Sequence, residues 1–126
     1  FETESHVGSP VYHTDVLMYI GTEMIGICFD VIKEEHREFV REKVSRFHDI
    51  LELSSQQIIN FCGNAIEAKN KKNELYIIMS TCAYNALEEN QINFLSKKYN
   101  EIIHSDIPTI EKYGGGSVRC MLTELF

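Results

Sequence analysis

The same order of structural elements occurs twice along this sequence, and that repetition constrains the fold more than any other feature. Residues 11–53 read as two apolar strands around a short turn, then an amphipathic helix, then a third strand. Residues 60–105 repeat that order roughly fifty residues later, a period that indicates a structural repeat. We therefore predict two ββαβ units of mixed α+β class.

The elements of each unit follow from the spacing of apolar residues. Phe39, Val40, Val44 and Phe47 recur at helical spacing among charged residues, and Ser54 has the chemistry of a helix N-cap. The predicted strands are residues 16–20, 24–29, 49–53, 64–69, 74–79 and 102–103, and the predicted helices are residues 33–47, 54–60 and 88–99.

The two ends of the chain lie outside the units. Residues 117–126 are predicted to form a strand that belongs to neither unit, and the polar residues 1–10 are predicted to be an unstructured or linking start. Two ββαβ units bury little core alone and leave strand edges open. They are better explained as consecutive blades of a closed ring, with residues 11–126 in one domain. A compact two-layer α+β domain, with helices on one mixed sheet, stays open as the alternative.

Charge and hydropathy exclude several classes of function. The formal net charge is −7 and the basic residues are scattered, so no nucleic-acid partner is expected. No apolar run approaches the roughly 18 residues of a membrane span, and no signal peptide is recognised. Because the sequence starts at Phe1 rather than at Met, we expect a fragment.

The spacing of Cys28, Cys62, Cys82 and Cys120 provides no CxxC pair, so neither a zinc site of the usual spacing nor any other cofactor is expected. An even number of cysteines permits two disulfides. However, Cys28 and Cys82 lie in apolar runs, where free thiols behave as small hydrophobic residues. We therefore predict a reduced, cytoplasmic protein.

A run of three glycines precedes Cys120, in the sequence GGGSVRCM over residues 114–121. Glycine permits positive φ and lets a ligand approach the backbone closely, so Gly115 and Gly116 are candidate contacts to a ligand. Cys120 then lies where a flexible loop enters the predicted last strand, which suits a nucleophile. The alternative is a buried strand cysteine, because free cysteine is often fully buried.

Three further candidates lie where the first strand of each unit begins. His13 can transfer protons near neutral pH, and Asp15, two residues on, could orient its ring or bind a cation. A surface loop is the alternative explanation for His13. Asn64 ends the segment NFCGN, residues 60–64, which is either a simple turn or a part of the same central region.

Taken together, these segments resemble the C-terminal half of the arginine deiminase-related proteins. That group belongs to the guanidino-group-modifying, or pentein, superfamily, which includes arginine deiminase, dimethylarginine dimethylaminohydrolase and the amidinotransferases. The resemblance rests on YHTDVLM, NFCGN, MS with AYNAL, and GGGSVRCM, at residues 12–18, 60–64, 79–80 with 83–87, and 114–121. It implies a propeller of five ββαβ modules, of which this chain supplies about two blades and a closing strand.

The resemblance also implies a mechanism. Cys120 attacks the guanidinium carbon, His13 transfers protons, Asp15 holds the guanidinium group, and Gly115, Gly116 and Asn64 line the substrate site, without metal or cofactor. The reaction is a hydrolysis or an amidino transfer through a covalent thiouronium intermediate. A non-catalytic relative that serves as a binding or scaffold module is the alternative.

The implied partners are a small guanidino compound and the N-terminal half of the same protein, which would provide the remaining acidic residues. The chain alone is therefore expected to be inactive. The open strand edges also allow a homo-oligomer.

Overall fold

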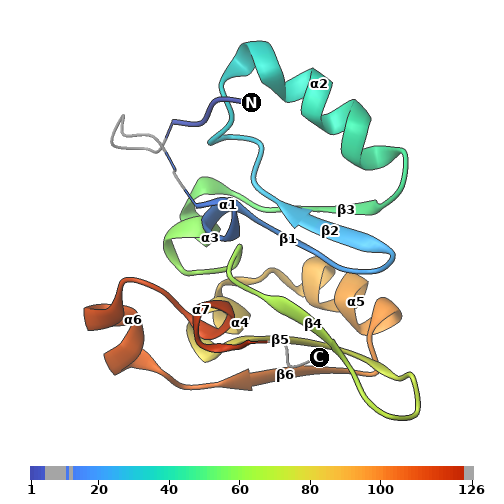
Figure 1. Ribbon diagram of the computed structural model, residues 1–126, viewed down its shortest axis with the longest axis vertical. Coiled ribbons are helices and arrows are strands. Elements are labelled where there is room, and N and C mark those ends of the chain that lie inside the picture. Colours follow the sequence, from blue (N-terminus) through green and yellow to red (C-terminus); the bar gives the residue numbers. More distant parts are fainter. Residues whose placement is uncertain (5–10, 12, 124–126) are drawn as a thin grey trace.

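Two three-stranded sheets form the framework of the chain, which a computed structural model describes over residues 1–4, 11 and 13–123. The first unit contains β1 (Met18–Ile20), β2 (Met24–Ile27), α2 (Glu34–Ser45) and β3 (Asp49–Glu52). The second contains β4 (Ile66–Lys69), β5 (Leu75–Ser80), α5 (Glu89–Lys98) and β6 (Glu101–Ser105). The units lie one above the other in Figure 1, where α2 covers the outer side of the first sheet.

The two sheets have the same topology. In the first, β1 pairs antiparallel with β2, and β2 pairs parallel with β3. In the second, β4 pairs antiparallel with β5, and β5 pairs parallel with β6. All four residues of the central strand β2 are buried, which explains why that segment is apolar throughout rather than alternating. The ββαβ order is therefore present twice, and the alternative of one mixed sheet is wrong.

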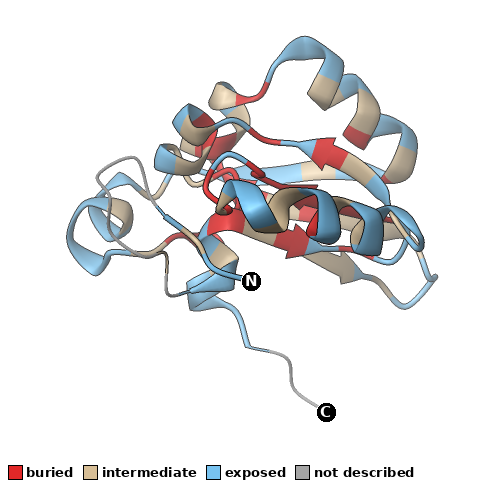
Figure 2. Cartoon of the chain, turned by 90° about the horizontal axis from the view of Figure 1, so that it is seen from above, coloured by how far each residue is buried: buried red, intermediate tan, exposed pale blue. Residues whose placement is uncertain are grey.

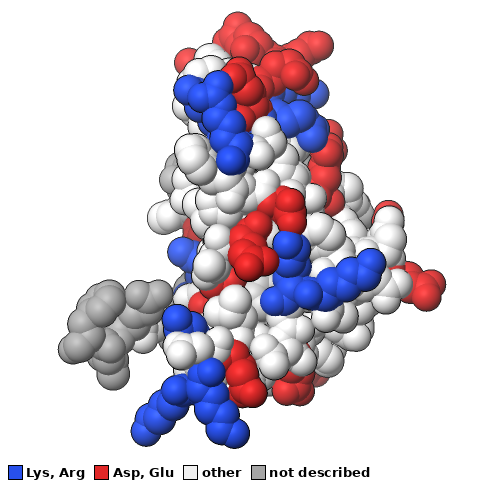
Figure 3. Space-filling view, turned by 90° about the vertical axis from the view of Figure 1, so that its right-hand side faces the viewer, with Lys and Arg blue, Asp and Glu red and all other residues white. Residues whose placement is uncertain are grey.

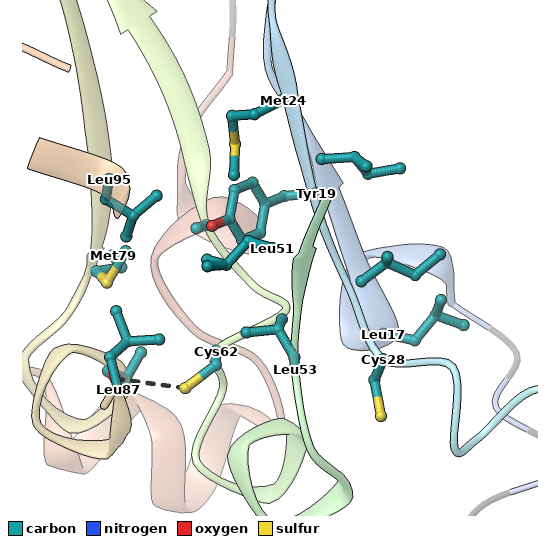
Figure 4. Packing of buried hydrophobic residues seen from close by; sticks show 14 of the residues in the cluster. Leu17, Tyr19, Met24, Cys28, Leu51, Leu53, Cys62, Met79, Leu87 and Leu95 are labelled. Carbon is teal, nitrogen blue, oxygen red and sulfur yellow. Dashed lines mark hydrogen bonds between the residues drawn. The ribbon is translucent and has the colours of Figure 1, made fainter. Parts of the chain in front are cut away.

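One hydrophobic core joins the two units. Tyr19, Met24 and Leu51 of the first unit face Met79 and Leu95 of the second, as Figure 4 shows. The buried residues in Figure 2 accordingly concentrate in the interior between the units, while α2 and α5 present exposed residues outward. The units therefore fold against each other rather than as separate domains.

The helix N-termini of the two units are also joined by hydrogen bonds. Ser54 caps α3 (Ser55–Ile59) in a capping box with Gln57, which confirms the predicted N-cap, and Glu88 and Gln91 form the same motif at α5. Gln57 Nε2 donates to Gln91 Oε1 at 2.6 Å, and Gln91 Nε2 donates to Gln57 Oε1 at 3.2 Å. This pair fixes the distance between α3 and α5.

Four short helices were not predicted: α1 (Thr14–Leu17), α4 (Thr81–Ala86), α6 (Pro108–Gly114) and α7 (Val118–Met121). The first shortens the strand predicted over residues 16–20, because one helical turn replaces its first half and a short apolar run does not distinguish a strand from a helix.

The predicted closing strand over residues 117–126 is wrong at α7, where Val118 is buried and Met121 and Leu122 are exposed. A segment this short with one buried residue is compatible with a helical turn as well as with a strand, so the sequence did not distinguish the two. Residues 124–126 lie outside the described part.

Of the predicted unstructured or linking start, residues 2–4 are structured, and the linking alternative stays a prediction. Thr3 pairs with Ile32 in an isolated antiparallel bridge, and the Glu4 N–H donates to the Val31 carbonyl at 2.8 Å. The Lys33 N–H likewise donates to the Glu2 carbonyl at 3.0 Å, so residues 2–4 satisfy backbone groups of residues 31–33 in the connection from β2 to α2. Residues 5–10 lie outside the described part.

Charged side chains of both signs are interspersed on the face shown in Figure 3. Lys98 bridges Asp49 at 2.5 Å and Glu23 at 3.4 Å, which links the second unit to the first. Within residues 1–4, 11 and 13–123, no helix is long and apolar enough to cross a membrane.

Candidate active site

A pocket of about 400 Å³ lies at the end of the sheets where α1, α3 and α7 come together, at the left in Figure 1. The three segments are far apart in the sequence, so the fold rather than local chain geometry creates this hollow. The pocket is lined by His13, Asp15, Val16, Ile58, Phe61, Asn64, Gly114, Gly115, Gly116 and Cys120. It therefore brings together all six residues that the sequence singled out.

A larger hollow of about 790 Å³ lies beside the connection from β2 to α2, away from these residues. Arg37 lines this hollow, and its guanidinium group already donates to the backbone carbonyls of Ile32 at 2.7 Å and Asp30 at 2.9 Å. The hollow is thus a charged surface depression in which the Arg37 side chain stabilises the backbone of the β2–α2 connection. The smaller pocket is the better candidate because nucleophilic and titratable side chains converge in it.

Cys120 is exposed and lies in the pocket on α7. Its thiol donates to Asp15 Oδ2 at 3.4 Å, and Asn64 Nδ2 lies 3.2 Å from its sulfur. Cys120 was predicted to begin a strand; instead it occupies a helical turn that follows the extended residue Ser117. The residue that precedes this turn is fixed to α6, because the buried Ser117 hydroxyl donates to Glu111 Oε1 at 2.7 Å.

The glycine run shapes the pocket beside the thiol. Gly115 ends α6 with φ of 71°, a left-handed conformation that disfavours other residues. At Gly116, a Cβ atom would lie 2.9 Å from the Cys120 sulfur, so only glycine leaves the thiol in place. The two glycines therefore serve different purposes: one permits the turn and the other permits the position of the sulfur.

His13 is the N-cap residue of α1, with an extended backbone and an exposed side chain. Asp15 lies within that helical turn, whereas the sequence predicted that the two residues lie where a strand begins. Both nevertheless line the pocket with Cys120. The Asp15 carboxylate accepts from Cys120 and from Asn64 Nδ2, the latter at 3.3 Å.

Asn64 is buried at the end of the loop between α3 and β4 and contacts both other segments of the site. Its Nδ2 also donates to the Asp15 backbone carbonyl at 3.2 Å, and its Oδ1 accepts from the Arg119 N–H at 3.0 Å. Arg119 Nη1 in turn lies 3.4 Å from the Ala65 carbonyl oxygen. The guanidinium of Arg119 therefore points to the backbone of the second unit.

Only one residue of the pocket's apolar wall was among the predicted candidates, namely Phe61 in the segment of residues 60–64. Val16, Ile58 and Phe61 form it, and Phe61 has φ of 63°, which is unusual for a bulky residue. Strain of this kind concentrates at functional sites. The neighbouring Gly63 is required for the approach of two segments, because a Cβ there would lie 2.2 Å from the Val16 carbonyl oxygen.

The four cysteines are free thiols, and they differ in environment. Burial raises the pKa of Cys28, and it raises the pKa of Cys62 to about 12. Burial, assisted by the carboxylates of Glu111 and Asp106, also raises the pKa of the half-buried Cys82. Cys120 is therefore the thiol that solvent and reagents reach. Among residues 1–4, 11 and 13–123, no three His, Cys, Asp or Glu side chains are grouped to hold a metal ion.

Comparisons with known proteins bear on the family and the fold of the chain. No curated protein matches the chain. Among solved structures, the apo form of ArgZ, described as an arginine dihydrolase from the ornithine-ammonia cycle in cyanobacteria, matches with a TM-score of 0.62 and 16% sequence identity. The match covers 87% of this chain and 16% of ArgZ, so the chain shares the fold of a small part of that protein. A family model described as N,N dimethylarginine dimethylhydrolase, eukaryotic, matches residues 1–126. The chain therefore belongs to the eukaryotic N,N dimethylarginine dimethylhydrolase family.

Proposed function

We propose that the protein carrying this sequence is a cysteine-dependent hydrolase that acts on the guanidinium group of a methylated arginine or a related compound. The observation that carries the proposal is the pocket in which an exposed thiol, that of Cys120, lies 3.4 Å from the carboxylate of Asp15 and shares its walls with His13. A planar cation and a carboxylate match each other geometrically and electrostatically. The family description supports hydrolysis over amidino transfer.

Binding of the guanidinium group would replace the contact between the Cys120 thiol and Asp15. The carboxylate then accepts from the guanidinium N–H groups, and the sulfur is left beside the guanidinium carbon. The positive charge of the substrate favours the thiolate over the thiol. Both effects matter because resonance makes this carbon a poor electrophile.

The reaction proceeds in two displacements. The Cys120 thiolate forms a bond to the guanidinium carbon, and the tetrahedral adduct expels an amine that takes a proton from His13. The product is an S-alkyl thiouronium on Cys120. His13 then takes a proton from water as the water oxygen bonds to the same carbon. The C–S bond breaks to return the thiolate, and the remaining hydroxyl proton passes to solvent, where the expelled amine takes it up, which leaves a neutral ureido product.

The complete site needs further acidic groups. Among the described lining residues, Asp15 supplies the pocket's one carboxylate. We propose that additional carboxylates, one on the guanidinium and one that orients His13, come from sequence outside these 126 residues, in the remaining blades of a five-bladed pentein propeller.

The test is turnover of N,N-dimethylarginine by the protein carrying this sequence, with release of dimethylamine and formation of citrulline both measured. Cys120→Ser and His13→Ala should each lower turnover by at least about a thousandfold without loss of the fold. Near-native turnover in Cys120→Ser would refute the mechanism. Absence of turnover on every arginine derivative and other guanidine tested would favour a non-catalytic relative.

A further inference from the structure

Asn64 lies at the centre of the pocket's hydrogen bonds. Its side chain is 4% exposed, although asparagine is polar and usually lies at the surface. Its amide contacts Asp15 on α1 and both Arg119 and Cys120 on α7. A buried polar side chain with all its contacts in the candidate site calls for a function there.

The backbone fixes which way this amide points. The Arg119 N–H can only donate a hydrogen bond, so the Asn64 oxygen must face it, at 3.0 Å. The Asn64 NH₂ group consequently faces the Cys120 sulfur at 3.2 Å and the Asp15 Oδ2 at 3.3 Å. The two hydrogens of this group are shared among these two acceptors and the Asp15 backbone carbonyl, which lies at 3.2 Å.

We propose that Asn64 is a positioning residue that holds the Cys120 thiolate beside the Asp15 carboxylate by donating to both. Two adjacent negative groups repel each other, and a shared N–H donor offsets that repulsion. This inference rests on the proposed function, and it replaces the expectation that Asn64 contacts substrate, because the amide is already fully engaged. Among the described residues, the segments packed around it also carry His13, Arg119 and, on α6, Glu111, which accepts from the Ser117 hydroxyl.

The experiment measures alkylation of Cys120 by iodoacetamide as a function of pH, without substrate, with peptide mass spectrometry to quantify each thiol. The decisive variant is Asn64→Asp, which keeps an oxygen for the Arg119 N–H and removes the donor to the sulfur. The matched control is Asn70→Ala, which removes an amide that bonds the Lys72 and Glu74 N–H groups in the turn between β4 and β5.

Asn64→Asp should lower the alkylation rate at neutral pH by about tenfold and move the pH midpoint upward, because the sulfur loses a hydrogen-bond donor and gains a negative neighbour. Asn70→Ala should leave the rate and the midpoint at wild-type values, because it alters a remote turn. A folded Asn64→Asp protein with the wild-type rate and midpoint would overturn the proposal.

A second measurement needs no substitution. In ¹H–¹⁵N spectra of the unmutated protein, the Asn64 side-chain NH₂ resonances should shift with the ionisation of Cys120 and lose that shift once Cys120 is alkylated. NH₂ resonances that stay unchanged both on ionisation and on alkylation of Cys120 would also overturn the proposal. Because neither measurement requires turnover, an inactive wild-type protein with these responses would refute the proposed function and leave the inference on Asn64 standing.

Discussion

The Cys120 sulfur lies 3.4 Å from Asp15 Oδ2, although 105 residues separate the two in the sequence. The contact exists because one core joins the two ββαβ units and carries α1 and α7 to the same end of the sheets. In the proposed function, this contact places the nucleophile beside the group that binds the guanidinium cation.

Alkylation should be selective for one thiol. Near neutral pH, iodoacetamide should modify Cys120 at least about tenfold faster than Cys28, Cys62 or Cys82, because these three are more buried and burial raises their pKa. Peptide mapping at short reaction times measures the ratio. Uniform, slow modification of all four thiols would contradict the proposed nucleophile.

Asp15→Asn should lower kcat/KM for a guanidino substrate by about ten- to a hundredfold, since it removes the charge that holds the cation. Asp49→Asn is the matched control: it removes an exposed carboxylate that pairs with Lys98, and such pairs contribute little. Steady-state kinetics of the two variants give the comparison. Equal activities would show that Asp15 does not bind substrate.

The left-handed turn at Gly115 should tolerate asparagine better than valine. Gly115→Val should lower the free energy of unfolding by about 1–2 kcal/mol, because a β-branched residue disfavours φ of 71°. Gly115→Asn should cost less, since asparagine adopts this conformation readily. No atom lies within 4 Å of the added Cβ, so the difference in urea denaturation isolates backbone strain from crowding. Identical losses for both variants would rule out strain as the cause.

Stability should fall at alkaline pH through Cys62. Burial raises its pKa from 9.0 to about 12 in the folded state, so its stabilising effect is complete below pH 9 and is lost as the pH rises toward 12. In that window the free energy of unfolding should fall by about 1.4 kcal/mol per pH unit from this group.

Cys62→Ser provides the control, because its hydroxyl can still donate to the Ala83 carbonyl, which Cys62 Sγ contacts at 3.3 Å, and it does not titrate. Urea unfolding at about pH 8 and about pH 10.5 should show a shallower pH dependence in the variant. Equal slopes in the two proteins would show that Cys62 ionises as readily in the folded state as in the unfolded state.

The two ββαβ units could be predicted because their information is local. The apolar spacing on α2 and α5 and the capping box at Ser54 specify those elements without tertiary contacts. The one-turn helices α1 and α7 could not be predicted, since four residues are too few to show a period. The signals for α4 and α6, a Ser80 N-cap and Pro108 at the first helical turn, were present in the sequence and were missed.

For the candidate site too, some features could be predicted from the local sequence and others depend on tertiary contacts. His13, Asp15 and Cys120 could be named as candidates from short motifs, because their residue types suit the chemistry, and the structure places all three in one pocket. The bond between the Arg119 N–H and Asn64 joins residues 55 positions apart, and the positive φ of Phe61 depends on packing around it. Neither leaves a pattern in the local sequence.

The most direct test of the account is to mix the protein carrying this sequence with N,N-dimethylarginine, quench with acid during turnover, and map the modified peptides by mass spectrometry. The account predicts that the peptide containing Cys120 gains the mass of the amidino-linked substrate after loss of dimethylamine, and that Cys120→Ser shows no such gain. Turnover with an unmodified Cys120 peptide at every quench time, and undiminished turnover in Cys120→Ser, would contradict it.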